Sequence, residues 1–237
     1  HPLYIPPPPP QSERPARFLL KFQAIDILLR QCQPDTLLLL DADAVLVRWT
    51  SESDLHRALE GAALGMVEQT TICGSSMARA DFYDHYRAHT LAVLDPGGRP
   101  PALADFRYFN SGVVLGRAGE MAALSRWAIE TIARTPTHLV GKHMVADQDY
   151  FQFWALQKNP GCCRTLPGAW NHGEYWDAVF PRLGARIVHF SNFCNGPDVT
   201  TPLRMRALWS GAPGFLHRHF GRFFDWPETP AIHPPLQ

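Results

Sequence analysis

The strongest constraint on the fold is the segment Thr36–Leu40, a short apolar run that ends abruptly at Asp41-Ala42-Asp43. A run of this length without polar alternation is typical of a central strand in a parallel sheet that is covered on both faces. The other predicted strands are 63–67, 108–115 and 186–190, and the predicted helices are 18–30, 51–60, 82–94, 121–133 and 147–157. Helices that alternate with strands predict an α/β domain.

The length and composition of the chain fit one domain between two proline-rich ends. Residues 1–16 form a predicted arm or linker, because the five consecutive prolines at 6–10 hold the backbone extended. A second proline-rich segment, 224–237, is predicted to be a surface tail. The intervening 17–223 is the predicted folded domain, and 46% of the 237 residues are hydrophobic, which is enough for a sizeable core.

The bulk properties exclude several classes of protein. The formal net charge is zero, so the usual electrostatic reason to expect nucleic acid as a partner is missing. No stretch is long and apolar enough to span a bilayer, so we expect membrane association only through regions outside this chain. The five cysteines have no CxxC spacing, which argues against a zinc ribbon and favours buried, reduced thiols. Cytoplasmic and secretory-pathway (Golgi-like) locations both stay open.

Asp41 and Asp43 are candidate ligands for a metal ion. They follow a predicted buried strand, and in open α/β sheets ligands bind beyond the carboxyl ends of the strands. Two carboxylates at such a place can hold a hard divalent cation such as Mn²⁺ or Mg²⁺. The alternative is that both aspartates only cap the turn after the strand.

Polar residues interrupt the predicted strand 108–115 at Asn110-Ser111-Gly112. Gly112 would let a ligand approach the backbone closely, and Asn110 and Ser111 can hydrogen-bond sugar hydroxyls. The alternative is a β-bulge, in which glycine is also common.

Asp147-Gln148-Asp149 opens the predicted helix 147–157. A carboxylate beside an amide can orient a ligand that carries many hydroxyl groups. The alternative is a capped helix N-terminus, where acidic residues are favoured.

Three later residues complete the set of candidates. His189 ends an apolar stretch and could be a third metal ligand through its neutral imidazole, or a core histidine with its hydrogen bonds satisfied. Trp170 could stack on a sugar face and Asn171 could bond a hydroxyl. The alternative for Trp170 is a core tryptophan.

In this order, the segments resemble those of the GT-A glycosyltransferases, most closely glycosyltransferase family 8, the glycogenin and bacterial galactosyltransferase group. Asp41-Ala42-Asp43 looks like the family's Asp-x-Asp motif, and His189 looks like its late metal-binding histidine. The sugar-contacting strand and the Asp-Gln pair that touches the donor sugar match 109–112 and 147–149. The matched region runs from about residue 17 to about residue 197.

The resemblance implies the GT-A fold, a Rossmann-like nucleotide-diphospho-sugar transferase fold in which helices flank a mixed, mostly parallel central sheet. It also implies transfer from a nucleotide diphosphate sugar, by expectation a UDP-sugar, to a carbohydrate or other hydroxyl acceptor with retention of configuration. Mn²⁺ or Mg²⁺ would be the cofactor. Gln148 and Asp147 would act at the reacting centre, and Lys21, with Arg17 as second choice, would be the family's basic donor contact.

The chain departs from the family pattern in two places. A proline-rich arm stands where the family has its first nucleotide-binding strand, and no lysine occurs in 191–197, after the histidine. The histidine region also resembles the fungal and plant α-galactosyl and α-xylosyl transferases. A catalytically inactive carbohydrate-binding or scaffold module of GT-A shape is the competing interpretation. A metal-dependent phosphohydrolase would leave Asn110-Ser111-Gly112 unexplained.

Overall fold

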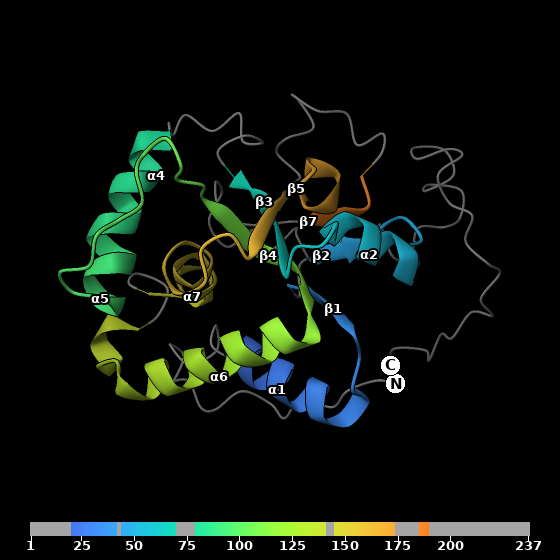
Figure 1. Cartoon of the computed structure of the whole chain (residues 1–237), viewed down its shortest axis with the longest axis horizontal. Helices are drawn as coiled ribbons and strands as arrows, with labels where there is room; N and C mark the ends of the chain where they lie inside the picture. Colours follow the sequence, from blue (N-terminus) through green and yellow to red (C-terminus); the bar gives the residue numbers. More distant parts are fainter. Residues whose placement is uncertain (1–19, 42–43, 70–78, 141–144, 174–184, 190–237) are drawn as a thin grey trace, which may run out of the picture.

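Two small β-sheets and the helices around them make up the computed structural model, which describes residues 20–41, 44–69, 79–140, 145–173 and 185–189 (Figure 1). The strands are β1 Thr36–Leu40, β2 Ala44–Leu46, β3 Leu64–Glu68, β4 Phe109–Arg117, β5 Cys163–Leu166, β6 His172–Gly173 and β7 Ile187–His189. The α-helices are α1 Leu20–Cys32, α2 Glu52–Leu59, α4 Arg79–His85, α5 Ala92–Leu94, α6 Ala118–Arg134 and α7 Asp147–Phe153. The π-helical segments are η2 Tyr86–Leu91 and η4 Trp154–Lys158, and the 3₁₀ turns are η3 Thr137–Leu139 and η5 Gly168–Trp170.

The larger sheet has the strand order β1-β4-β3-β5. β4 is antiparallel to both of its neighbours, and β5 is parallel to β3. β1, β3 and β5 therefore run in one direction with β4 reversed between β1 and β3. This arrangement confirms a mixed α/β sheet with flanking helices in which most strands share a direction. The carboxyl ends of β1 and β3 therefore lie at the same end of the sheet as the first residues of β4.

The prediction that Thr36–Leu40 is a central parallel strand is wrong for the part of the chain that the structure describes. β1 occupies the end of the four-stranded sheet and pairs with β4 in antiparallel register. Leu37 is its one buried residue, and the other four are partly exposed. A continuous apolar run marks a strand but does not fix its neighbours.

β4 carries a shift in register at the polar segment noticed in the sequence. Met66 of β3 pairs with Val114, whereas the next residue, Val67, pairs with Asn110. The residues 111–113 of β4 consequently lie opposite no residue of β3, as in a β-bulge. The bulge frees the backbone of Ser111 to bond a side chain from α7.

The helices cover the larger sheet through one main core. α1 and α6 lie side by side along the sheet, and the Ser125 hydroxyl of α6 donates to the Phe22 carbonyl of α1 (Figure 1). The side chains of Phe22 and Ile25 pack with those of α6, because they recur on one face of α1. α7 lies beside β4, and its Phe151 ring contacts Phe22 at 5.2 Å between centroids.

A smaller sheet of order β2-β7-β6 follows the end of β1. β7 pairs antiparallel with β2 and parallel with β6. Its Ile187 joins a second core with Trp170 of η5 and Val113 of β4. The two sheets are thus joined by packing, and the pairing of β7 places His189, its last residue, beside the larger sheet. Within the described residues, no helix has the length and apolar character needed to cross a bilayer.

Most predicted elements are confirmed with shifted ends. The helix predicted at 51–60 is α2, and Ser51 caps it, accepting a hydrogen bond from the Asp54 amide at 3.2 Å. The helices predicted at 82–94 and 147–157 both continue into π-helical segments. The short strands β2, β5 and β6 were not predicted. The predicted arm 1–16 and tail 224–237 lie outside the described residues.

Candidate functional site

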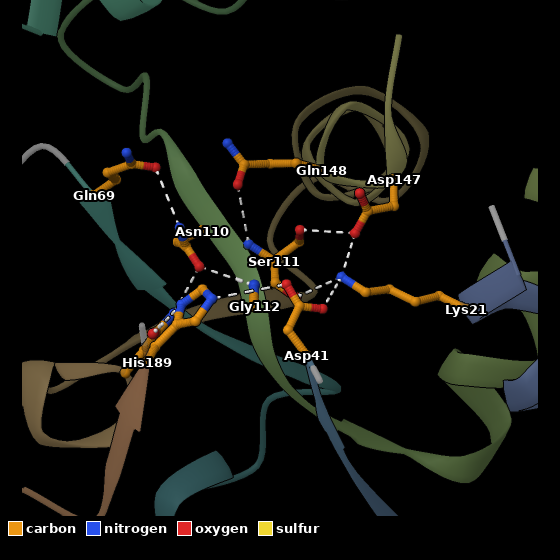
Figure 2. A network of polar contacts seen from close by, with 10 residues as sticks. Lys21, Asp41, Gln69, Asn110, Ser111, Gly112, Asp147, Gln148 and His189 are labelled. Atoms are coloured by element: carbon orange, nitrogen blue, oxygen red, sulfur yellow. Dashed lines mark hydrogen bonds and ion pairs between the residues drawn. The ribbon is translucent and has the colours of Figure 1, made fainter. Parts of the chain in front are cut away.

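Polar side chains from distant parts of the chain meet at the carboxyl end of β1. Asp41 follows β1 directly, and its amide donates to the Gly112 carbonyl of β4 at 2.8 Å. The first turn of α7 faces the bulge of β4, so Asp147 and Gln148 lie close to Ser111 (Figure 2). Lys21 reaches into the same place from α1. Ligands of open α/β sheets bind at such strand ends.

Lys21 is the cationic centre of the network. Its ammonium group forms ion pairs with both Asp41 and Asp147, and it donates to the Ser111 carbonyl at 3.3 Å (Figure 2). Burial by itself would lower the pKa of Lys21, but the carboxylates of Asp147 and Asp41 outweigh burial and raise it. Lys21 therefore stays charged and holds the two carboxylates together.

Asp41 lies in a setting that disfavours its charge. Burial raises the pKa of Asp41, and the attraction of Lys21, which acts in the opposite direction, does not cancel this effect. The nearby carboxylate of Asp147 also raises it. A further cation at this carboxylate would offset the unfavourable burial.

The Ser111 residue of the bulge connects β4 to α7. Its hydroxyl donates to Asp147 Oδ2 at 3.1 Å, and its amide donates to Gln148 Oε1 at 3.3 Å. Asp147 thus accepts from Ser111 and Lys21 together. These contacts orient the carboxylate of Asp147 and the amide of Gln148 from the same backbone segment.

His189 is held by a chain of amide groups. Its Nδ1 lies 3.0 Å from Asn171 Oδ1, and Asn171 Nδ2 donates to Asn110 Oδ1 at 2.8 Å. The Gly112 amide donates to the same Asn110 oxygen at 2.8 Å. A Cβ atom on Gly112 would come within 2.0 Å of the imidazole ring. Gly112 was predicted to admit a ligand, and here it admits the ring of His189.

Two of the expected metal ligands, Asp41 and His189, lie close enough together to reach one divalent cation. His189 Nε2 and Asp41 Oδ2 face each other at 3.9 Å (Figure 2). Two atoms that each lie about 2.1 Å from one cation can be up to about 4.2 Å apart, so both can bind the same ion. The third expected ligand, Asp43, lies outside the described residues, among which no group of three or more His, Cys, Asp or Glu side chains forms a metal site. Arg17 also lies outside them.

Asp149 and Trp170 occupy positions apart from this network. Asp149 accepts from the Ala146 amide at 2.8 Å and from the Thr90 hydroxyl, as an acidic residue that caps its own helix does. Trp170 is 5% exposed, and the Arg186 guanidinium lies over its ring at 5.1 Å. Both side chains are buried, and their contacts with a donor stay predictions.

Two glutamines in this region were not among the site residues predicted from the sequence. Gln69 follows β3 as Asp41 follows β1, and its Oε1 lies 3.5 Å from Asn110 Nδ2. Gln152, one turn after Gln148 on α7, accepts from the Phe109 amide at 2.8 Å. A polar residue directly after a predicted strand was the available signal for Gln69. Gln152 had no such signal, since its partner is backbone in another element.

Of the comparisons with known proteins, only the one with solved structures finds similar proteins. No family model matches the chain, and no curated protein matches it. Its structure is similar to the galactosyltransferase LgtC in complex with donor and acceptor sugar analogs, with a TM-score of 0.46, 14% identity and coverage of 80% of this chain and 66% of LgtC. An active-site mutant of LgtC gives a TM-score of 0.47 with the same identity and coverage.

A third similar structure is the apo form of the bifunctional glycosyltransferase WbbM, with a TM-score of 0.42, 15% identity and coverage of 72% of this chain and 31% of WbbM. The chain spans just under two thirds of LgtC and about a third of WbbM.

Proposed function

We propose that this chain transfers a sugar from a nucleotide diphosphate sugar, with UDP-sugars as the first class to test, to a hydroxyl group of an acceptor. The observation that carries the proposal is one connected network at the end of β1. It is built from α1, β4, α7, β7 and the residue after β1, and its members are Lys21, Asp41, Ser111, Asp147, Gln148 and His189.

The charge of the network favours a ligand with a bound cation. Lys21 neutralises one of the two carboxylates of Asp41 and Asp147, which leaves an excess of negative charge in a half-buried place. Retaining buried charge is costly unless it is paired. We propose that Asp41, His189 and Asp43 hold Mn²⁺ or Mg²⁺, which when bound would offset the charge on the departing diphosphate.

The other residues of the network would bind and orient the donor. Asp147, fixed by Lys21 and Ser111, offers carboxylate oxygens to sugar hydroxyls, and Gln148 presents its amide beside it. Lys21 would remain charged next to phosphate oxygens. We propose that the reaction proceeds with retention, with Gln148 near the reacting carbon and the leaving phosphate accepting the proton of the acceptor hydroxyl.

The proposal is tested by thermal unfolding in the presence of Mn²⁺, UDP or both. A ligand that binds only the folded state raises the melting temperature. We expect UDP to stabilise the protein only when Mn²⁺ is present, and we expect Asp41→Asn to lose this effect. Asp105→Asn, which changes an exposed aspartate outside the network, is the matched control and should respond like the wild type.

Stabilisation by UDP that does not depend on Mn²⁺, or that survives in Asp41→Asn, would contradict the metal assignment. A complete lack of response to UDP, GDP and other nucleotides with Mn²⁺ would favour the inactive scaffold instead.

A further inference from the structure

Asn171 and Asn110 have both ends of their amides engaged inside the protein. Asn171 is 1% exposed, and its oxygen faces His189 while its nitrogen faces Asn110. Asn110 uses its oxygen for Asn171 and Gly112, and its nitrogen faces Gln69 at 3.5 Å. Such a pair of side chains is arranged to bond the protein itself. The almost complete burial of Asn171 disfavours its predicted contact with a sugar hydroxyl.

One backbone amide determines which atom donates and which accepts in each of these hydrogen bonds. The Gly112 N–H can only donate, so the Asn110 atom that it meets is the carbonyl oxygen. The Asn171 atom next to that oxygen must also donate, which identifies it as the amide nitrogen. The other end of Asn171 is therefore an oxygen, and it accepts from whatever faces it.

That oxygen faces Nδ1 of His189 at 3.0 Å. Nδ1 must carry a proton to donate to it, so the neutral ring has its lone pair on Nε2. Nε2 is the nitrogen directed at Asp41 Oδ2. A histidine that binds a metal commonly donates its other ring N–H to a carbonyl or carboxylate oxygen, which fixes the tautomer and the plane of the ring.

The plane of the ring is fixed from a second side. The imidazole lies where a Cβ of residue 112 would be, with Cε1, Nδ1 and Nε2 at 2.0, 2.5 and 2.7 Å from that position. No other residue type than glycine has room for it there. The imidazole ring is thus held twice. Asn171 bonds its Nδ1, and Gly112 leaves room for the ring itself.

We propose that Gly112, Asn110 and Asn171 are positioning residues that fix His189 in the Nδ1–H tautomer with Nε2 directed at Asp41. The proposal deepens the proposed function, on which its metal-binding part rests. It reassigns Asn110 and Asn171 from donor-sugar contacts to the support of a metal ligand.

The tautomer is measured directly by long-range ¹H–¹⁵N correlation spectra of metal-free protein with ¹⁵N-labelled histidine. The signal of His189 is identified by its loss in His189→Gln. We expect the wild type to show the Nδ1–H form and Asn171→Leu to lose that preference. Asn171→Asp loses the N–H that donates to Asn110, but it keeps an oxygen opposite Nδ1 and should keep the Nδ1–H form. Asn159→Leu, which removes an exposed amide bonded to Glu120, is the control.

Mn²⁺ affinity, measured by calorimetry and by the electron paramagnetic resonance signal of free Mn²⁺, is the second readout. Loss of a partner of a ligand histidine typically weakens metal binding by about 10- to 100-fold, which is the fall expected for Asn171→Leu. Asn159→Leu should bind Mn²⁺ much like the wild type.

The outcomes separate the two proposals. An Nε2–H tautomer in the wild-type protein would overturn the positioning role, even if Asn171→Leu failed to fold. Unchanged Mn²⁺ affinity in folded Asn171→Leu would also overturn it while the proposed function stood. A wild-type protein that shows the Nδ1–H tautomer but binds no Mn²⁺ would refute the metal-dependent function and leave the tautomer assignment intact.

Discussion

Individual residues near this site make contacts that the motifs around them in the sequence do not indicate. Gly112 is required because the imidazole of His189 occupies the place of a side chain, and its backbone is not in the left-handed region. Asp149 stands beside the site residues in the sequence, yet it bonds Ala146 and Thr90. Which residue types stand at the site could be predicted from the sequence. Which way each side chain points could not, because that depends on partners far along the chain.

Gly112→Ala tests the fit of glycine against the ring. The new methyl group must displace the imidazole, so we expect a loss of about 1–3 kcal/mol of unfolding free energy, as for other overpacked sites. We also expect weaker Mn²⁺ binding. Gly119→Ala is the matched control, because a Cβ there meets nothing within 4 Å and lies in α6. Alanine in place of a helical glycine should stabilise the protein by up to about 1 kcal/mol.

Urea denaturation and Mn²⁺ titration of both glycine variants provide the measurement. Wild-type stability and Mn²⁺ affinity in Gly112→Ala would show that the ring does not lie against residue 112.

Asp149→Asn tests the burial of that carboxyl group. Burial raises the pKa of Asp149 above its ordinary value, although hydrogen bonds from Thr90 and the Ala146 amide act in the opposite direction. A raised pKa in the folded state means that the contribution of this carboxyl to stability is present below its unfolded pKa of about 3.9 and is lost as the pH rises through the folded pKa. The stability of the wild type relative to Asp149→Asn should therefore fall with rising pH.

Denaturant unfolding of both proteins across the pH range from the acid side to neutrality checks this trend. A difference in unfolding free energy that stays constant with pH would contradict a raised pKa of Asp149.

At the scale of elements, hydrogen bonds between β4 and α7 hold the candidate site together. Gln148 and Gln152 lie one helical turn apart on α7, and both accept from backbone amides of β4. The sequence predicts this helix, which opens on acidic residues, and this strand, which polar residues interrupt. A β-bulge at Asn110 was one of two alternatives from the sequence, because the register depends on pairing with β3. Strands as short as β6 have too few residues to show any alternation.

Gln152→Ala tests whether α7 holds the start of β4. The substitution leaves the buried Phe109 amide and Arg107 carbonyl without this partner. Unsatisfied buried groups cost about 1–3 kcal/mol each, so we expect a loss of at least that size in unfolding free energy. Gln157→Ala, which removes a bond to the Arg99 carbonyl at an exposed site, is the control and should change stability little. Equal stability of the two variants in urea would contradict the role of Gln152.

At the scale of the whole molecule, the fold brings together side chains from the four motifs whose order carries the resemblance. Asp41, Ser111, Asp147 and His189 are far apart in the sequence and meet because β4 lies between β1 and β3 and β7 packs against the larger sheet. The ion pairs of Lys21 with two carboxylates were not predicted, because the residues involved lie on separate elements. Trp170 was weighed as a sugar-stacking residue, and its core position follows from packing with β4 and β7 that no local pattern reveals.

The most direct test is the release of nucleoside diphosphate from a panel of UDP-, GDP- and other sugar nucleotides, with Mn²⁺ and with a chelator. Each donor is assayed with the wild type, Asp41→Asn, Asp43→Asn and the control Asp105→Asn. We expect release from at least one donor that requires Mn²⁺, persists in Asp105→Asn and falls by about 100-fold or more in Asp41→Asn and Asp43→Asn while the proteins stay folded. Release that continues at the wild-type rate in folded Asp41→Asn, or that is indifferent to removal of the metal, would contradict the proposed metal-dependent glycosyl transfer.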